Sequence, residues 1–468
     1  MRSSTPSKNG KKGWRRKVSR KPSSVDVPPP NFVSVVGLGC PKNQVDTENL
    51  LGELLRREVV ICPDPADASV IIVNTCGFIA PARTEGAEVL DECIDHRTNG
   101  GCRLLAVVGC WVQRETRELR QRFPQVDLWM GLLTPERIGW LIEEVLGERR
   151  LASRPPGPAE ALGAELGRVR LSPAHWAYLK IADGCDNRCA YCAIPDIRGR
   201  LRSKPHDAVV EEAQRLAEEG VKEINLVAQD ITAYGHDVDG RPHLVSLLAD
   251  LARVDGIEWI RLLYTHPAHF TDDLIALIAE EPKVCHYVDL PIQHVSDRIL
   301  GQMGRRVTRR DIESLIGRLR DRVADVVLRT TVLVGFPGES EREFDELCDF
   351  LRDVRFERLG CFAYWPEPHT PAFGLPGLLP EDERLRRADR VMDLQQEIAW
   401  GIAGSWVGRE LPVIVDEPGE KRGAFLGRTY GDAPEIDPVI LLSGSVSPGE
   451  ITRARVTEAR GYDLVGTV

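Results

Sequence analysis

Three cysteines stand close together in the stretch DGCDNRCAYC, at Cys185, Cys189 and Cys192. Thiolates at short spacing are ligands of zinc ions and of iron-sulfur clusters, and both kinds of site ordinarily have four ligands. A structural zinc site usually draws on two CxxC or Cys/His pairs, and no second pair follows nearby. The spacing therefore indicates a metal centre in which another group takes the fourth position, with a zinc site as the alternative.

A second set of three cysteines is spread along the first 110 residues. Cys40, Cys76 and Cys110 each follow a short apolar run and are separated by 36 and 34 residues. Because parallel strands end at the same edge of a sheet, and such sheets bind ligands there, we expect these three thiols to converge. The alternative is that each one is a small buried apolar residue.

The remaining cysteines have no partners at metal-like spacing. With no export signal in the sequence, a disulfide framework is the weaker interpretation of the 12 cysteines, so we expect these six to fill the core: Cys62, Cys93, Cys102, Cys285, Cys348 and Cys361.

Five segments of different character make up the chain, and the first three lie in its N-terminal part. Residues 1–30 carry nine Lys or Arg and one acidic residue, which predicts a disordered basic tail. In residues 31–148, apolar runs without polar alternation alternate with helical periodicity, which predicts a doubly wound parallel sheet. Residues 149–170 are rich in Pro, Gly and Ala and are predicted to be a linker.

The second half of the chain contains two further predicted domains. Six strand-helix units in residues 171–402 predict a partial (β/α)6 barrel, with strands at 176–182, 223–228, 258–264, 286–290, 327–334 and 358–364. Residues 404–468 hold short strands separated by Gly, Pro and Asp, which predict a small antiparallel β-barrel. The fold class is therefore α/β with a C-terminal β-barrel.

Composition excludes several classes of protein. Hydrophobic residues make up 42% of the 468 residues and charged residues 28%, as in a globular protein with a sizeable core. No apolar run approaches the roughly 18 residues of a membrane span, and no apolar segment follows the N-terminus as in a secretory signal. We expect a cytoplasmic protein without a membrane anchor.

The CxxxCxxC spacing after the first barrel strand resembles that of the radical S-adenosylmethionine enzymes. Together with the N-terminal trio and the C-terminal barrel, it makes residues 31–468 similar to the methylthiotransferases, whose last domain is called TRAM. The resemblance implies two [4Fe-4S] clusters, one held by Cys40, Cys76 and Cys110 and the other by Cys185, Cys189 and Cys192. It also implies that S-adenosylmethionine fills the open iron position, serves as methyl donor and yields a 5′-deoxyadenosyl radical.

Four further positions match the family's cofactor site. Tyr191 occupies the aromatic position before the last cysteine, and Gln229 follows the second barrel strand beside Asp230. Gly335 and Gly338 stand in VGFPGES, which resembles the family segment close to the ribose. Loop packing, capping and an ordinary Gly-Pro turn are the respective alternatives.

The stretches VGLGCPKNQVDTE, LRTTVLVGFPGE, GRTYGDAPEID and GYDLVG resemble RimO, the branch that modifies a ribosomal protein. This implies methylthiolation of the β-carbon of an aspartate in small-subunit ribosomal protein number twelve, with a sulfur donor and a low-potential electron donor as further partners. A tRNA adenosine methylthiotransferase is the alternative, and a non-catalytic iron-sulfur module that binds the ribosome is a third hypothesis.

The charge of the C-terminal domain bears on this choice. Residues 404–468 hold seven Lys or Arg and ten Asp or Glu, whereas an RNA-binding barrel should be positively charged. Nucleic-acid binding is therefore not expected beyond contact with the basic tail, and an acidic barrel would attract a basic ribosomal protein. We expect the loop GDAPEID, with Asp432, Glu435 and Asp437, to be the substrate-docking surface.

Overall fold

A computed structural model describes residues 32–147 and 167–468 of the chain. The predicted basic tail and most of the predicted linker lie outside the described residues. Near the start of the second described range, the backbone N–H of Val169 donates to the carbonyl of Glu48 at 3.0 Å, so the last residues of the predicted linker are attached to the N-terminal domain.

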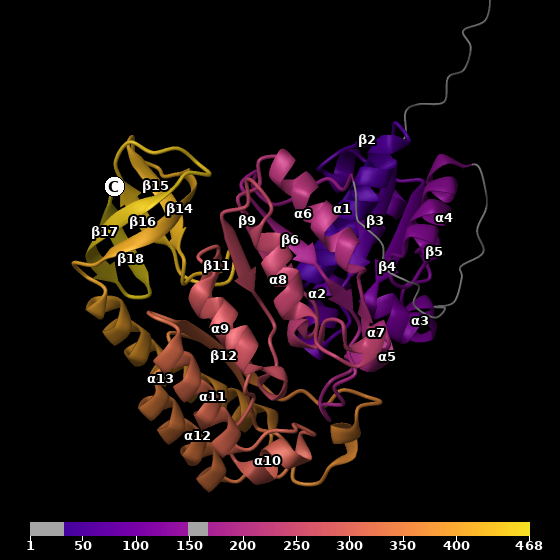
Figure 1. The fold of residues 1–468 in the computed structure, drawn as a ribbon. Helices are drawn as coiled ribbons and strands as arrows, with labels where there is room; N and C mark the ends of the chain where they lie inside the picture. The colour runs from indigo at the N-terminus through magenta and orange to yellow at the C-terminus, as the bar shows by residue number, and fades with distance from the viewer. Residues whose placement is uncertain (1–31, 148–166) are drawn as a thin grey trace, which may run out of the picture. The chain divides into compact units, whose positions relative to one another are not determined.

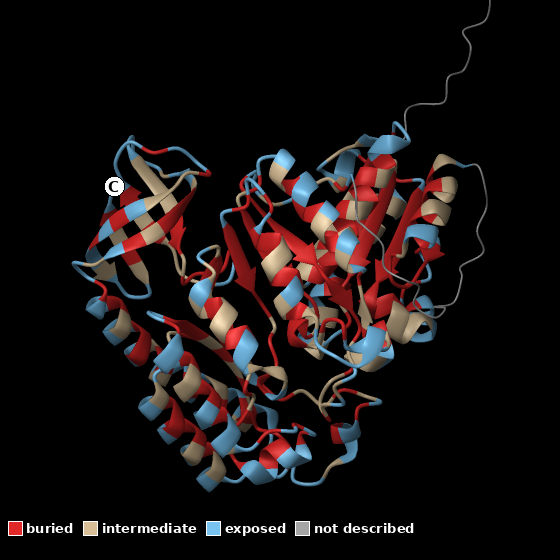
Figure 2. Ribbon diagram, viewed as in Figure 1, coloured by how far each residue is buried: buried red, intermediate tan, exposed pale blue. Residues whose placement is uncertain are grey.

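The N-terminal domain is built on a five-stranded parallel sheet with the strand order β2-β1-β3-β4-β5. Apolar side chains of β3 and β4 alternate between two clusters, one shared with α1 and α4 and the other with α2 and α3. Every residue of β3 and β4 is buried, and Figure 2 shows these central strands in red. The predicted doubly wound arrangement is confirmed. The strands and helices are β1 (Phe32–Gly37), α1 (Pro41–Arg56), β2 (Val60–Ile61), η1 (Pro65–Asp67), β3 (Val70–Thr75), α2 (Ala80–Asn99), β4 (Leu104–Gly109), α3 (Cys110–Arg122), β5 (Leu128–Trp129) and α4 (Pro135–Leu146).

The second domain is an open barrel of six parallel strands in the order β13-β12-β11-β10-β9-β6 (Figure 1). β6 and β13 are the two edges, so the sheet does not close, as predicted for six units. Its elements are β6 (Trp176–Lys180), β7 (Ala182–Asp183), α5 (Ile194–Arg198), β8 (Arg202–Ser203), α6 (His206–Glu218), β9 (Glu223–Val227), η2 (Ile231–Ala233), α7 (His236–Asp239), α8 (Leu244–Ala252), β10 (Trp259–Leu262), η3 (Pro267–His269), α9 (Asp272–Glu280), β11 (Val284–Asp289), α10 (Asp297–Gln302), α11 (Arg309–Arg322), β12 (Val327–Val334), α12 (Glu341–Val354), β13 (Arg358–Ala363), η4 (Pro371–Gly374) and α13 (Glu381–Ser405).

The C-terminal domain is a closed five-stranded barrel in the order β14-β15-β16-β18-β17. The predicted small antiparallel barrel is confirmed, except that one of its five pairings, between β16 and β18, is parallel. Strands that alternate in direction along the chain cannot alternate all the way round a closed ring of five, so one like-directed pair must form. The strands are β14 (Glu410–Pro418), β15 (Ala424–Thr429), β16 (Ile440–Ser443), β17 (Ile451–Arg460) and β18 (Asp463–Thr467).

None of the described helices is long and apolar enough to cross a membrane.

Candidate functional site

The three N-terminal cysteines lie at the carboxyl ends of three adjacent strands. Cys40 precedes α1 after β1, Cys76 directly follows β3, and Cys110 is the first residue of α3 after β4. Gly39 allows the first two loops to approach, because a Cβ on it would lie 2.7 Å from the Cβ of Cys76, and its φ of 97° suits glycine. The structure therefore brings the predicted trio to one edge of the sheet.

Two cations set the electrostatics of this first trio. Burial by itself would raise the pKa of Cys40, but the charges of Lys42 and Arg198 and nearby backbone N–H groups bring it below its ordinary value. Burial raises the pKa of Cys110 to about 12, although Arg198 donates to its Sγ at 3.3 Å. A buried pocket of thiols beside cations suits thiolates bound to a metal centre.

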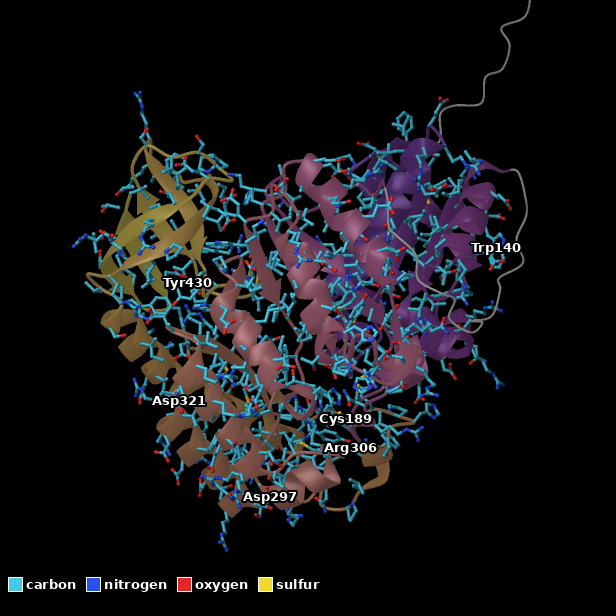
Figure 3. The ribbon with its side chains drawn as sticks, in the orientation of Figure 1. Trp140, Cys189, Asp297, Arg306, Asp321 and Tyr430 are labelled. Carbon is cyan, nitrogen blue, oxygen red and sulfur yellow. The ribbon has the colours of Figure 1, made fainter. Side chains whose placement is uncertain are left out.

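The second trio lies in the loop between β7 and α5, at the carboxyl end of the first barrel strand. Backbone hydrogen bonds hold this loop on both sides, from Ala190 N–H to the carbonyl of Met303 and from Ala372 N–H to the carbonyl of Ala190, both at 2.8 Å. The guanidinium of Arg305 is 3.8 Å from the Sγ of Cys189. Figure 3 labels Cys189 and, beside it, Arg306, which follows Arg305 in the sequence.

The cysteines of the second trio are half-buried and close enough to interact. Burial first, and then the charge of Asp230 and that of Cys189, raise the pKa of Cys185 to about 12. Burial and the charge of Cys189 also raise the pKa of Cys192, which Arg305 opposes. These interactions among the three thiols agree with the prediction that they lie close together in this loop.

One compact group of possible metal ligands stands apart from the cysteines. Within the described residues, the one set of three His, Cys, Asp or Glu side chains with donor atoms within 4.8 Å of one another is Asp230, His266 and His269. The cysteine trios do not meet this limit in the described structure, so the choice between an iron-sulfur cluster and a zinc ion depends on the resemblance of the sequence motifs.

The residues predicted to contact the cofactor have mixed environments. The ring of Tyr191 packs in an apolar cluster with Phe336 and Tyr364. Gln229 donates to Asp183 at 3.0 Å, while its buried Oε1 has no protein partner. That orphaned acceptor suits a polar donor of a bound ligand, such as the amino group of S-adenosylmethionine.

The two glycines of VGFPGES, Gly335 and Gly338, lie in different environments. A Cβ on Gly335 would lie 2.4 Å from the Cγ of Arg384 in α13, and its φ is 72°. Its N–H donates to Glu339 at 2.8 Å. Helix packing therefore explains this glycine. Gly338 has a φ of 81° and no atom closer than 3.8 Å to a Cβ built on it, so it lies in a more open place.

A buried charged network connects the two cysteine regions. Arg198 binds Asp46 at 3.0 Å and Asp183 at 3.0 Å, and Lys180 binds Asp46 at 2.5 Å. The side chain of Arg198 is 1% exposed. It stands six residues after Cys192, yet it contacts Cys110 of the other trio. Sequence reasoning missed it, because its partners are distant in the sequence and no local pattern marks them.

A second polar cluster lies at the ends of β9 and β10. Asp230 accepts from Asn187, in the second cysteine loop, at 2.7 Å and from His269 at 2.8 Å. Burial first, and then the charge of Arg305, lower the pKa of His266 to about 3, so its ring is neutral. The sequence analysis considered only Asp230. The signal for the histidines was present in the stretch THPAH directly after the third barrel strand.

The predicted docking loop does not form a common exposed surface. Asp432 is 2% exposed and binds the guanidinium of Arg358 at 2.6 Å. The side chain of Asp437 is 4% exposed and accepts from the hydroxyl of Tyr287 at 2.7 Å. These carboxylates instead fasten the C-terminal barrel to strands β13 and β11.

Glu435 differs from its neighbours, because the residue is exposed, although it also accepts from the hydroxyl of Tyr178 at 3.1 Å. Ion pairs within the fold take up Asp416, Asp432 and Asp437 of this domain and one basic residue, Arg428. Seven acidic and six basic residues are then left of the ten and seven in the sequence. The barrel surface is nearly neutral rather than strongly acidic.

Comparison with known families matches three segments of the chain. The model of the Radical SAM superfamily covers residues 179–351, that of the uncharacterized protein family UPF0004 covers residues 33–131, and that of the TRAM domain covers residues 407–468. These segments fall within the three domains of the structure.

Curated relatives match nearly the whole chain. The ribosomal protein uS12 methylthiotransferase RimO of Desulfitobacterium hafniense is 42% identical over 440 residues, which cover 93% of this chain and 98% of that protein. The proteins of the same name from Geobacter sulfurreducens and Myxococcus xanthus are each 43% identical, over 93% and 94% of this chain and 98% and 92% of their own.

Solved structures share the fold at low sequence identity. The radical S-adenosylmethionine methyltransferase TsrM of Kitasatospora setae has a TM-score of 0.56 and 16% identity, over 73% of this chain and 75% of that one. The cobalamin-dependent S-adenosylmethionine radical enzyme OxsB has a TM-score of 0.50 and 12% identity, over 79% and 56% of the two chains.

Proposed function

The chain belongs to the RimO family of ribosomal protein uS12 methylthiotransferases, and we propose that it replaces a C–H bond on the β-carbon of an aspartate of uS12 with C–SCH3. The observation that carries this proposal is that Arg198 connects the two cysteine trios. Its guanidinium donates to Cys110 of the first trio, and in the sequence it stands six residues after Cys192 of the second. A methylthiolation needs both hydrogen removal and sulfur transfer at one carbon atom. Two neighbouring centres can act on one carbon.

The six cysteines would hold two [4Fe-4S] clusters, as the family implies. Cys185, Cys189 and Cys192 would leave one iron open for S-adenosylmethionine, and Cys40, Cys76 and Cys110 would hold the second cluster. When bound, these groups supply hydrogen-atom abstraction from carbon and transfer of a methylated sulfur. The convergence of Cys40, Cys76 and Cys110 at one sheet edge and the match to the Radical SAM superfamily over residues 179–351 support this assignment.

The protein's own residues position these groups and exclude water. Arg305 places positive charge beside Cys189, and Gln229 offers a buried free acceptor next to the second cysteine loop. Tyr191 and Phe336 form an apolar wall behind that loop. Gly338, in the more open turn, is the better of the two predicted glycines for contact with the ribose. Radical chemistry needs such a dry and rigid site, because water and mobile side chains offer competing reactions.

A tRNA substrate is the second candidate function, and the surface charge argues against it. Binding of a phosphate backbone requires an excess of Lys and Arg. After the internal ion pairs are removed, the C-terminal barrel has seven acidic and six basic residues. A nearly neutral barrel favours a protein substrate, although it no longer supplies the acidic docking surface that the sequence suggested.

The test is intact-mass analysis of purified uS12 after incubation with the reconstituted enzyme, S-adenosylmethionine and a low-potential reductant. A gain of about 46 mass units, as expected when SCH3 replaces H, should map to one aspartate. The Cys40→Ala, Cys76→Ala, Cys110→Ala triple variant should keep about four irons per chain and still cleave S-adenosylmethionine. It should yield no methylthiolated product.

The matching triple variant at Cys185, Cys189 and Cys192 should lose S-adenosylmethionine cleavage altogether. Cys62→Ala removes a half-buried thiol that packs at the edge of the N-terminal core and donates to the carbonyl of Asp64, and it serves as the control with full activity. Unmodified uS12 together with a methylthiolated adenosine in tRNA would move the assignment to the second function.

A further inference from the structure

Lys42 is a buried cation for which the described structure provides no carboxylate. Three described lysines are buried, and two of them are neutralised: Lys180 by Asp46 at 2.5 Å and Lys204 by Glu212 at 2.6 Å. Lys42 is 6% exposed and forms no ion pair with an Asp or Glu among the described residues. Burial opposes the charge of Lys42, but Tyr264 and the thiol of Cys40 raise its pKa. Neither group is a carboxylate, so the buried ammonium can still take a carboxylate from a ligand.

The ammonium of Lys42 is held in place by an aromatic ring. Its Nζ lies 3.4 Å from the centre of the Tyr264 ring. The backbone N–H of Tyr264 donates to Asp289 at 2.9 Å, and the φ of Tyr264 is 61°, an unusual value for tyrosine. An unfavourable backbone conformation at Tyr264 therefore holds its ring under the ammonium.

The ammonium of Lys42 has an aromatic partner and no carboxylate among the described residues. Its side chain interacts with Tyr264, and 6% of the residue is exposed. A carboxylate that reached this exposed part would add a charged partner to the ammonium.

A chain of contacts leads from Lys42 to both cysteine regions. It stands two residues after Cys40, while Tyr264 follows β10 at the barrel edge. Tyr264 accepts from the backbone N–H of Ile231, the residue after Asp230, and Asp230 binds Asn187 in the second cysteine loop. A ligand on Lys42 would lie next to the first trio and at the same barrel edge as the second.

We propose that Lys42 binds the side-chain carboxylate of the target aspartate and thereby places its β-carbon between the two centres. This inference rests on the proposed function. In an aspartate side chain the β-carbon is bonded directly to the carboxyl carbon, so fixing the carboxylate fixes the reacting atom to within one bond. A charged hydrogen bond in a dry site also distinguishes aspartate from asparagine, because an amide leaves the ammonium without a counter-charge.

The test compares two substrates, uS12 and uS12 with its target aspartate changed to asparagine, by mass analysis of the methylthiolated product. The wild-type enzyme should prefer the aspartate substrate. Lys42→Met, which keeps the length and removes the charge, should lower kcat/KM for the aspartate substrate about 30- to 100-fold, as expected for one charged hydrogen bond. Its rate on the asparagine substrate should stay the same or rise, so that the preference disappears.

Two further variants control for charge and for folding. Lys42→Arg retains the positive charge and should retain most of the preference for aspartate. Lys222→Met removes a lysine whose ion pair with Glu258 is on the surface, with 37% of the lysine side chain exposed, and should behave as wild type. For each variant, the iron and sulfide content is measured. The amount of 5′-deoxyadenosine that forms without a matching amount of methylthiolated uS12 is measured as well.

Three results would overturn the inference. If Lys42→Met keeps the preference for the aspartate substrate over the asparagine substrate, the ammonium does not bind the carboxylate. This result would leave the proposed function intact. A loss of about half of the iron in Lys42→Met would assign the ammonium to the first cluster instead. Failure of the wild-type enzyme to modify either form of uS12 would refute the proposed function and this inference together.

Discussion

At the scale of single residues, the role of a buried charge in this protein depends on partners that are far away in the sequence. The cysteines could be predicted, because their spacing and their places after apolar runs are local signals. Arg198 and Lys42 could not, because their roles come from Asp46 and Tyr264, and no periodicity connects these positions. The burial of Asp432 and Asp437 was missed for the same reason, since nothing local in GDAPEID shows that Arg358 will bind Asp432.

Arg198 gives the first residue-scale prediction. Arg198→Met removes one partner each of Asp46 and Asp183 and the donor to Cys110, all of which are buried, while Asp46 keeps Lys180 and Asp183 keeps Gln229. Breaking a buried ion pair by removing one partner typically costs about 3–5 kcal/mol, and the remaining partners place the expected cost at the lower end of this range. We expect lower thermal stability and loss of iron from the first cluster before the second, measured by calorimetry and by iron content after partial chelation. Arg200→Met, at a guanidinium whose side chain is 88% exposed, is the control, and equal behaviour of the two variants would contradict a bridging role.

At the scale of elements, the parallel arrangement of the strands decides where the chemistry lies. The uninterrupted apolar runs predicted the six strands of the open barrel to within a few residues, because strands covered on both faces need no polar alternation. The two-residue edge strands β2 and β5 of the N-terminal sheet were not predicted. Convergence of Cys40, Cys76 and Cys110 followed from this topology alone. The parallel pairing of β16 with β18 was missed, because it depends on ring closure rather than on any single strand.

The loop between β15 and β16 carries the prediction at this scale. Asp432 binds Arg358, the first residue of β13, so the loop lies at the amino end of that strand, away from the carboxyl ends that carry the cysteine loops. Asp432→Asn should therefore weaken the attachment of the C-terminal barrel by about 1–3 kcal/mol, the cost of an unsatisfied buried group, with little change in the affinity for uS12. The measurement pairs chemical unfolding with a binding titration.

Glu435→Gln is the matched variant in the same loop, because Glu435 is exposed. It should leave the stability nearly unchanged. A stable Asp432→Asn protein with weakened uS12 binding would instead restore the docking role that the sequence suggested.

At the scale of the whole molecule, the C-terminal barrel and the open barrel share one buried ionic network. Arg428 of β15 binds Glu223 of β9 at 2.7 Å and Asp416 of β14 at 2.9 Å. Arg261 of β10 binds the other oxygen of Glu223 at 2.9 Å, and His175 binds Asp416 at 2.8 Å. The hydroxyl of Tyr430, labelled in Figure 3, donates to the carbonyl of Asp325 and adds a neutral contact. Glu223 is the first residue of its strand, so this interface also lies at the amino ends.

This network predicts that acid releases the two domains. Burial opposes ionisation of Glu223 and Asp416, but their basic partners overcome it, so the pKa of each carboxyl is below its ordinary value near 4. A carboxyl whose pKa is lowered by folding stabilises the fold above its unfolded pKa, and this stability is lost as the pH falls through the lower folded pKa. Asp437 opposes the trend, because burial raises its pKa. The melting temperature should be flat from about pH 8 to 5 and fall below about pH 4.

Arg428→Met tests the same network at neutral pH. Without its guanidinium, Glu223 and Asp416 each lose a partner and their pKa values should rise, so acid instability should begin at a higher pH. Stability at pH 7 should drop by about 3–5 kcal/mol, the usual cost of breaking a buried pair. Arg455→Met, in the same barrel but with its side chain 61% exposed beside Glu410, should keep the wild-type profile. If the two variants show the same pH profile in calorimetry, the buried network does not hold the domains together, and apolar packing across the interface must do so instead.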